Sequence, residues 1–125
     1  MTQKSNERES VAFSESESEY LSEQRLGRLA TSSRSGRPHV VPVTYEFDGR
    51  YIYFGGWNLE RSLKFRTILE NPSVAFVVDD LVSVEPWRPR GIEIKGRAET
   101  LVEDGRPYVK ITTFSKRSWG LEHRR

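Results

Sequence analysis

The chain has 125 residues, enough for one domain with a single core, and it carries a net charge of +2 with a pI near 9.0. The absence of cysteine excludes disulfides, thiolate catalysis and cysteine-ligated metals, and the small net charge does not indicate a nucleic-acid-binding protein. No apolar run approaches membrane-spanning length and the N-terminus has no apolar signal core, so we expect a cytoplasmic protein that does not enter a membrane.

The first segment, MTQKSNERESVA (1–12), contains almost nothing to bury, and it predicts a disordered tail. The ordered domain is then expected over 13–121, followed by a short C-terminal tail at 122–125. The domain opens with FSESESEYLSEQ (13–24), which predicts a short helix. Ser14 or Ser16 can cap this helix, and acidic residues fill its first turn as the helix dipole prefers.

From residue 25 onward the hydrophobic residues recur at every second position, as in a strand, instead of at helical spacing. A strand is expected over 26–32, and HVVPVTYEF (39–47) alternates apolar and polar residues as a half-buried strand does. Asp48-Gly49 then predicts a tight type I′ turn, which needs positive φ, and 51–55 is the return strand. The segment 39–55 is therefore predicted to form a β-hairpin.

The second half of the chain is also predicted to be mostly strands. A helix follows the hairpin and ends at Asn71-Pro72, because the residue before proline disfavours helical geometry. The remaining expected elements are a strand buried on both faces (73–78), a long connection (79–91), an alternating strand (92–100), a turn (103–107) and a last strand (108–114). About six short antiparallel strands with two short helices predict a mainly β protein, a small barrel that one helix interrupts after three strands.

The charges on the second predicted helix are reversed. Arg61, Lys64 and Arg66 crowd its start and Glu70 lies at its end. A helix carries partial positive charge at its N-terminus, so cations at that end are unfavourable. A bound anion would offset this repulsion.

The residues around this helix start are suited to a phosphate. Asn58 and Ser62 can both cap the helix. With Ser62 as the cap, its hydroxyl, the free backbone N–H groups and the Lys64 ammonium would converge on one point, after two glycines (55 and 56) that permit close backbone approach. The alternative is plain surface, in which Lys64 and Arg66 pair with the glutamates four residues away along the helix. The sequence leaves both interpretations open.

Three other features have both a functional and a structural interpretation. Pro42 inside a strand marks a sheet edge, or a backbone left free to contact a planar ring. His39 is a structural histidine or a ligand-binding one. Trp87, Arg88 and Arg90 form either a lid or anion clamp, or a contact between subunits.

Several stretches together resemble one known superfamily. They are ATSSRSGRPHVVPVTYEFDGRYIYFGG, SLKFRTILENPSVAFVVDD, WRPRGIEIKGRAE and the closing SWG. Over residues 20 to 121 the chain resembles the pyridoxamine 5′-phosphate oxidase-like, flavin-binding split-barrel superfamily, and specifically its F420-dependent, OxyR-type branch. The resemblance implies a split β-barrel fold and a homodimer with two cofactor sites at the subunit interface.

The resemblance also implies roles for individual residues. Ser62 and Lys64 match the Ser-x-Lys pattern that holds the cofactor phosphate, and His39 stands where the oxidases usually have an arginine, which argues against oxidase activity. Trp119 would approach the cofactor of the partner chain, and Trp87, Arg88 and Arg90 would meet the substrate or the cofactor's polyglutamate tail. The other implied cofactor-binding residues are Val41, Pro42, Val43, Gly55, Gly56, Trp57, Asn58 and Arg61.

The expected function is an F420-dependent oxidoreductase that transfers a hydride between this deazaflavin and a small unsaturated or quinone-like molecule. The sequence has no recognisable nucleophile–base pair, which suits an enzyme whose cofactor carries the chemistry, and no catalytic residue is identified. Its two histidines do not make a metal site. The alternatives are an FMN-binding reductase or oxidase, and a cofactor-binding module without catalysis.

Overall fold

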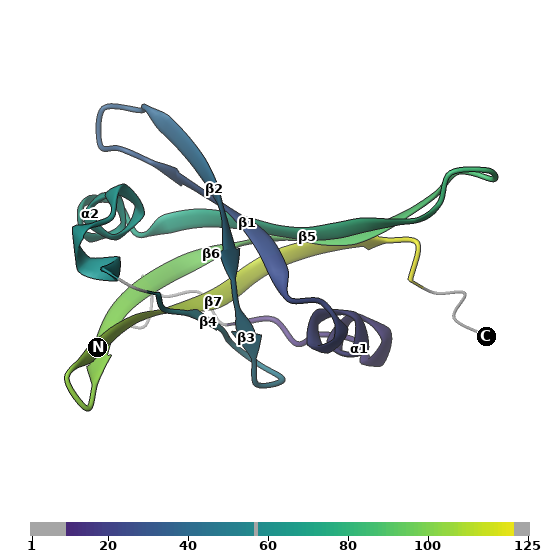
Figure 1. The fold of residues 1–125 in the computed structure, drawn as a ribbon, viewed down its shortest axis with the longest axis horizontal. Helices are drawn as coiled ribbons and strands as arrows, with labels where there is room; N and C mark the ends of the chain where they lie inside the picture. The colour runs from purple at the N-terminus through teal and green to yellow at the C-terminus, as the bar shows by residue number, and fades with distance from the viewer. Residues whose placement is uncertain (1–9, 57, 122–125) are drawn as a thin grey trace.

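A computed structural model describes residues 10–56 and 58–121 (Figure 1). In these ranges one antiparallel sheet of seven strands carries two α-helices and one 3-10 turn. In chain order the elements are α1 (Glu15–Glu23), β1 (Leu26–Ser32), β2 (Pro38–Thr44), β3 (Glu46–Phe47), β4 (Ile52–Phe54), η2 (Leu59–Arg61), α2 (Leu63–Glu70), β5 (Ser73–Ser83), β6 (Arg88–Glu103) and β7 (Arg106–Trp119). The predicted mainly β fold with two short helices is confirmed, with seven strands rather than six.

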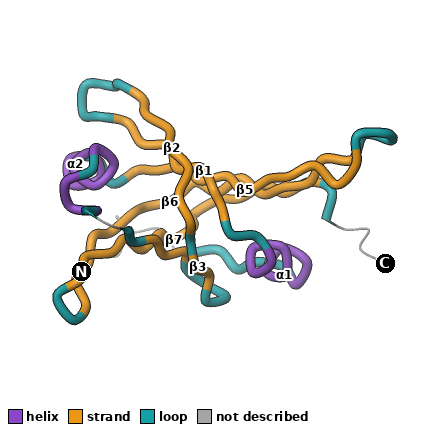
Figure 2. Tube along the Cα trace, in the orientation of Figure 1, coloured by secondary structure: helices purple, strands orange, loops and turns teal. Residues whose placement is uncertain are grey.

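The sheet curls back on itself. Its strand order is β2-β1-β5-β6-β7-β4-β3, and the outermost strands β2 and β3 are consecutive in the chain, separated only by Tyr45. The two edge strands of the sheet are therefore connected through a single residue, which curls the sheet as in the predicted split barrel. Figure 2 shows α2 beside one end of the strand layer, whereas α1 lies nearer its middle and the β5–β6 hairpin extends beyond α1.

The core lies inside the curl. Alternate residues of each strand point inward, so Ile92, Ile94 and Ala98 of β6 are buried while the residues between them face outward, as the alternation predicted. The aromatic ring of Phe76 in β5 packs edge-on against Tyr45 at 5.5 Å between ring centroids. Apolar burial of this kind supplies most of the stability of the fold.

Strand β5 was predicted to be buried on both faces, and this was wrong. Val74, Phe76 and Val78 are buried, but Ala75 and Val77 between them are only half-buried. Its second face lies outside the barrel, where no other part of the described chain covers it completely. A continuous apolar run does not by itself distinguish a doubly covered strand from one with a small-residue outer face.

The long connection predicted over 79–91 is wrong as well. β5 and β6 continue as one hairpin through this segment, with Asp79 opposite Gly91 and Asp80 opposite Arg90. The polar residues that suggested a loop are instead held in the ladder by side-chain ion pairs, such as the one between Arg90 and Asp80. β7 likewise runs to Trp119, beyond the predicted end at residue 114.

The predicted hairpin over 39–55 is confirmed only in part. β3 and β4 pair, but β2 pairs with β1 instead, because the strand breaks at Tyr45. The turn is not type I′: Gly49 alone has positive φ, and the Asp48 carboxylate accepts hydrogen bonds from the backbone N–H groups of Arg50 and Tyr51. The other Asp-Gly pair, Asp104 (φ 53°) and Gly105 (φ 76°), has positive φ at both positions and joins β6 to β7.

Helix α1 begins as predicted. Ser14 caps it by accepting the Glu17 N–H, and the Glu17 carboxylate accepts the Ser14 N–H in return. Within the predicted N-terminal tail, Val11 N–H donates to the Thr113 carbonyl at 3.0 Å, so order begins before residue 13. The remainder of that tail (1–9) and the predicted C-terminal tail (122–125) lie outside the described residues.

Candidate functional site

Of the two candidate caps in the sequence, Asn58 and Ser62, the second begins α2. Ser62 is the N-cap in extended geometry, and its Oγ accepts the Phe65 N–H at 3.2 Å. Lys64 therefore occupies the second helical position. The first turn of the helix contains no acidic residue and its last turn no basic one, so the reversed charge pattern is a feature of the folded helix.

The Ser62 hydroxyl is already engaged. It donates its proton to the Leu59 carbonyl at 2.6 Å, which fixes the junction between η2 and α2. A hydroxyl has one proton, so Ser62 cannot also donate to an anion without breaking this bond. Ser62 thus shapes the helix start, and donors for an anion would be the backbone N–H groups of Leu63 and Lys64, which lack intrahelical partners, and the Lys64 ammonium.

Ion pairing within α2 does not neutralise its cations. The ion pairs between described residues are Arg28–Asp79, Arg90–Asp80 and Lys116–Glu17. Lys64 and Arg66 take part in none of them, although Glu60 and Glu70 stand four residues away. The surface interpretation with i,i+4 ion pairs is therefore not realised, and Arg61 and Arg66 are exposed beside a half-exposed Lys64.

The glycine loop before η2 opens onto a cavity of about 870 Å³. Gly55, Gly56 and Asn58 line it, and a Cβ at Gly56 (φ +134°) would meet open space. Asn58 has left-handed geometry (φ 56°) and precedes η2 without a side-chain cap. The predicted Trp57 lies outside the described residues.

The charge of this cavity does not suit a phosphate. Glu60, Glu103 and Asp104 line it against a single cation, Arg106. Carboxylates that line the same cavity would repel a bound anion. The structure brings the three loop residues together but leaves Ser62 and Lys64 out of this lining, so an anion belongs at the helix start rather than in the hollow.

Strand β2 presents the predicted His39, Val41, Pro42 and Val43. Pro42 is exposed, and β2 is the last strand of the order, so the edge interpretation of this proline is confirmed. Val41 and Val43 point inward, while the outer backbone edge of the strand is unpaired in the sheet. That edge is available for contact with a planar ring.

His39 lies opposite Thr31 of β1. Its Nδ1 is buried without a hydrogen-bond partner, and the Thr31 Oγ1 is buried and unpartnered as well. Asn71, at the end of α2, donates to the carbonyl of Ser32, the neighbour of Thr31. His39 therefore lies in the region of the C-terminal end of α2, and no hydrogen bond in the described chain joins it to Ser62 or Lys64.

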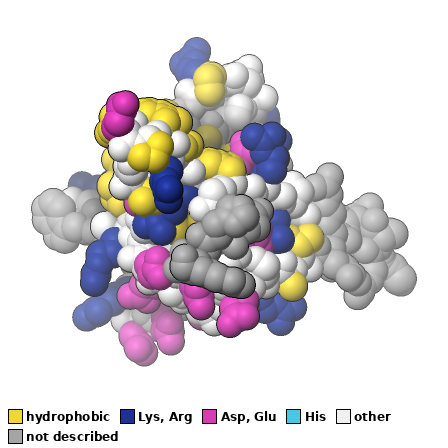
Figure 3. Space-filling model, turned by 90° about the vertical axis from the view of Figure 1, so that its right-hand side faces the viewer, with side chains coloured by type: hydrophobic (Ala, Val, Ile, Leu, Met, Phe, Trp, Pro, Cys, Tyr) yellow, Lys and Arg dark blue, Asp and Glu magenta, His cyan; other side chains and the backbone are white. Residues whose placement is uncertain are grey.

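The remaining predicted residues lie near the other end of the molecule (Figure 1). Trp87 and Arg88 are exposed at the tip of the β5–β6 hairpin, and Trp119 ends β7 against Gly91. Figure 3 shows hydrophobic side chains gathered on the face of this end. One chain does not bring these residues to α2.

Arg90 is engaged within the chain. Its guanidinium donates to both carboxylate oxygens of Asp80 (2.8 and 3.2 Å) and lies 4.9 Å from the ring centroid of Tyr20, whose hydroxyl donates to the same carboxylate. Hydrogen bonding from Arg90 is the main reason that the pKa of Asp80 is lowered. Arg90 is thus a structural link between the hairpin and α1, and of the proposed clamp only Arg88 remains unpaired.

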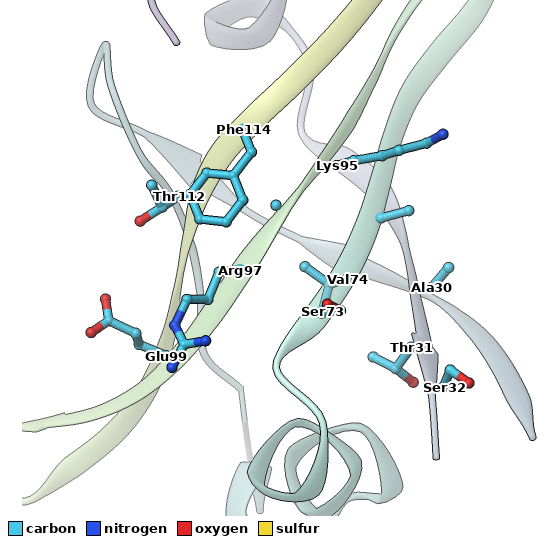
Figure 4. Close-up of a pocket in the computed structure, with 12 residues that line it drawn as sticks. Ala30, Thr31, Ser32, Ser73, Val74, Lys95, Arg97, Glu99, Thr112 and Phe114 are labelled. Carbon is cyan, nitrogen blue, oxygen red and sulfur yellow. The ribbon is translucent and has the colours of Figure 1, made fainter. Parts of the chain in front are cut away.

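Sequence reasoning missed a second cavity, of about 1020 Å³, on the outer face of the sheet (Figure 4). Small residues of β1 and β5 form one part of its lining, and Lys95 and Arg97 of β6 with Phe114 of β7 form another. The outward cations were visible in the alternation of β6. Only the pairing of β1 with β5 and of β5 with β6 places small residues beside them.

Two further observations concern the described residues alone. No three histidine, aspartate or glutamate side chains in 10–56 and 58–121 gather as metal ligands would. In the same ranges, no helix is long and apolar enough to cross a membrane.

Comparison with known proteins gives consistent results. The sequence profile of the family described as pyridoxamine 5′-phosphate oxidase matches residues 13–120. A 5a,11a-dehydrotetracycline/5a,11a-dehydrooxytetracycline reductase of Streptomyces rimosus is 43% identical over 122 residues, covering 90% of this chain and 86% of that protein.

Two solved structures share the fold. A conserved hypothetical protein of Mycobacterium tuberculosis has a TM-score of 0.74 at 23% identity, over 94% of this chain and 91% of its own. A protein named F420 reductase has a TM-score of 0.63 at 23% identity, over 79% of this chain and 94% of its own. At this level of identity the likeness establishes the fold alone.

Proposed function

The chain belongs to the pyridoxamine 5′-phosphate oxidase family, and on that premise we propose that it is a reductase that uses the deazaflavin F420. The observation that carries the proposal is the start of α2, where Arg61, Lys64 and Arg66 lie within four residues of the cap Ser62 and form no ion pair with a described carboxylate. A phosphate group on a cofactor would neutralise this cluster. When bound in its reduced form, F420 would supply the hydride from its deazaflavin ring.

The residues of this chain would hold such a cofactor in defined ways. Lys64 and the first-turn N–H groups would bind the phosphate, and Ser62 would keep the turn in place through its bond to Leu59. The unpaired edge of β2 around Pro42 would lie along the ring system. The chain thus contributes positioning and electrostatics, and the cofactor contributes the reaction chemistry.

Two candidate cofactors fit the helix start, because F420 and FMN both carry a phosphate. F420 is favoured by the extra exposed cations Arg61 and Arg66, which its polyglutamate tail can use and FMN cannot. The fold likeness to a protein named F420 reductase is consistent with this choice. His39 in place of the arginine of the oxidases favours a reductase over an oxidase.

We also propose a substrate with an unsaturated fused-ring skeleton. The support is the relative at 43% identity, whose name gives its substrates as 5a,11a-dehydrotetracyclines. Reduction would add the hydride to a carbon–carbon double bond conjugated with an oxygen function, and a proton from solvent or an acid would complete the product.

A homodimer is proposed as the functional unit. Exposed apolar side chains occur at both ends of the elongated chain: Val84 and Trp87 at the hairpin tip, and Leu63 and Leu69 on α2, each 49–67% exposed. Two such patches on one surface suit a two-fold dimer in which the tip of each subunit covers α2 of the other. Light scattering during size-exclusion chromatography is expected to give twice the 14.5 kDa of one chain.

Fluorescence titration of the purified protein with F420 and with FMN tests the cofactor assignment. We expect the wild-type protein to bind F420 with micromolar or tighter affinity. Lys64→Ala should bind at least about tenfold more weakly, a loss of about 1.4 kcal/mol or more. Lys110→Ala is the control and should bind as the wild type does, because Lys110 is a lysine of β7 whose ammonium lies over the Tyr51 ring. Tighter binding of FMN than of F420 would instead indicate an FMN-using member of the family. Binding of neither would reject the site, and binding without reduction of any fused-ring substrate would favour the non-catalytic module.

A further inference from the structure

We propose that the outer-face cavity between β1, β5, β6 and β7 is the substrate subsite, and that it accepts an oxygen-rich fused-ring molecule with an acidic oxygen. This inference rests on the proposed function, since it identifies the place of the hydride acceptor. The cavity of about 1020 Å³ is comparable to sites for drug-sized molecules, which measure about 300–1,000 Å³. Figure 4 shows it on the sheet above the end of α2.

The hollow arises from residue size. Ala30 of β1 and Ala75 of β5 are paired neighbours in the sheet, and their methyl side chains leave space on its outer surface. Lys95 and Arg97 of β6 and Phe114 of β7 are long side chains on the adjoining strands. Short side chains beside long ones make a recess that a flat molecule can fill.

The charge of the recess favours an acidic ligand. Lys95 and Arg97 are exposed, and neither forms an ion pair with any described carboxylate. Glu99 is the carboxylate of the lining, which leaves the cavity with a net charge of +1 from two cations and one anion. An ionised enol or carboxylate would pair with these cations, and Arg97 could bind two such oxygens at once.

A second polar group of the lining lies on the same face as the cations. Thr112 of β7 pairs with Arg97 of β6, so its side chain lies on the outer face beside the guanidinium. Thr31 also borders the cavity, but its side chain shares the inward face of Leu29 and points away from the face of Ala30. A ligand oxygen could therefore accept a hydrogen bond from the Thr112 hydroxyl while Arg97 binds a neighbouring oxygen.

Phe114 adds an aromatic wall. It falls where the register of β6 and β7 shifts, between the pairs Lys95–Ser115 and Gly96–Thr113, so it is the extra residue of a β-bulge in β7. Bulges re-aim side chains, and Figure 4 shows the Phe114 ring on the same side of the view as Arg97. The ring can pack against a planar ligand while Arg97 binds the ligand's oxygen.

The test uses tetracycline in EDTA-containing buffer as a probe, because its fused rings carry acidic enol and hydroxyl oxygens. Its binding to the full chain is followed by fluorescence, with and without F420. We expect saturable binding that Arg97→Ala weakens at least about tenfold and Ala75→Phe, which fills the recess, weakens as much. Arg117→Ala is the matched control: Arg117 lies opposite Glu93 on the same sheet, outside the cavity lining, and its loss should leave the affinity unchanged.

F420 affinity and thermal unfolding of each variant separate the possible failures. If the protein binds F420 but not tetracycline, the subsite is wrong and the proposed function stands. The same conclusion follows if tetracycline binds with an affinity that neither Arg97→Ala nor Ala75→Phe changes. Tetracycline binding that depends on both residues, without any F420 binding, would support the subsite and reject the cofactor assignment. If Ala75→Phe unfolds, Ala30→Val on the neighbouring strand is the second cavity-filling variant, and unchanged probe affinity in it would also overturn the subsite.

Discussion

Both α-helices start at a serine cap, but the two starts have opposite electrostatics. At α1, Ser14 is followed by acidic residues, and Glu17 is buried with hydrogen bonds from Lys116 Nζ (2.8 Å) and Ser118 Oγ (2.7 Å). At α2, Ser62 is followed by Lys64, and none of the ion pairs between described residues involves a cation of this helix. The first helix start is satisfied within the chain and the second is not.

The difference separates a structural helix start from a candidate binding one. The dipole of α1 is complemented by Glu17, which also attaches the helix to β7, so nothing is left for a ligand. The dipole of α2 is opposed by its own side chains, which costs stability in the unliganded chain. Unfavourable charge at a helix start has a physical explanation if an anion occupies the site during function.

The largest effect is expected from breaking the satisfied start. Glu17→Gln removes the charge that faces Lys116 while keeping the side-chain shape, and we expect a loss of about 2 kcal/mol in the free energy of unfolding. Urea denaturation followed by circular dichroism measures it. Glu15→Gln in the same turn is exposed and should cost less than about 0.5 kcal/mol; equal losses would contradict the structural role of Glu17.

An intermediate effect is expected from pH. Burial raises the pKa of Glu17, but the hydrogen bonds from Lys116, the Ser14 N–H and Ser118 outweigh it, and the pKa of the folded carboxyl lies below its ordinary value of 4.5. A group with a lowered folded pKa stabilises the fold above its unfolded pKa, and this contribution is lost as pH falls through the folded value. The stability difference between wild type and Glu17→Gln should therefore be constant near neutral pH and shrink below about pH 4.5. A difference that stays constant down to pH 3 would contradict the assignment.

The smallest effect on stability, and the most diagnostic, is expected at α2. Lys64→Glu should stabilise the unliganded protein by about 0.5 kcal/mol, because it removes a cation from the helix start and places an anion there. The same change should abolish F420 binding. Differential scanning fluorimetry at low salt gives the first quantity and fluorescence titration the second. Arg50→Glu in the β3–β4 loop is the control for charge reversal in the titration, and it should leave F420 binding unchanged. Destabilisation by Lys64→Glu would mean that Lys64 has a structural partner.

Some of the fold and candidate site followed from local sequence. The cap at Ser14, the cap at Ser62 and the alternation of β6 each depend on residues within one turn or one strand of each other. Each cap is one of the two candidates that the sequence offered, and the alternation is as predicted. The two Asp-Gly pairs show the limit of such reasoning. Asp104-Gly105 forms the two-residue turn, whereas Asp48-Gly49 forms a longer one in which the aspartate carboxylate replaces a backbone hydrogen bond.

The candidate site depended more strongly on long-range contacts. The separation of Trp87 and Arg88 from α2 was not visible in sequence, because it follows from the extension of β5 and β6 into one long hairpin. The engagement of Arg90 with Asp80 depends on the register of that hairpin, which pairs these two residues directly. The outer-face cavity arises where four strands adjoin, so no single segment contains its signal.

By itself, the sequence determined the class of the fold, the positions of both helix starts and the reversed charges of α2, because these depend on neighbouring residues and on the dipole of one helix. The tertiary structure alone decided which face of β5 is covered and that Arg88, unlike Arg90, forms no ion pair with a described residue. It also decided where short and long side chains adjoin to form the outer-face cavity. Those outcomes depend on strand pairing across tens of residues, and hydrophobic periodicity specifies the faces of a strand without specifying its neighbours.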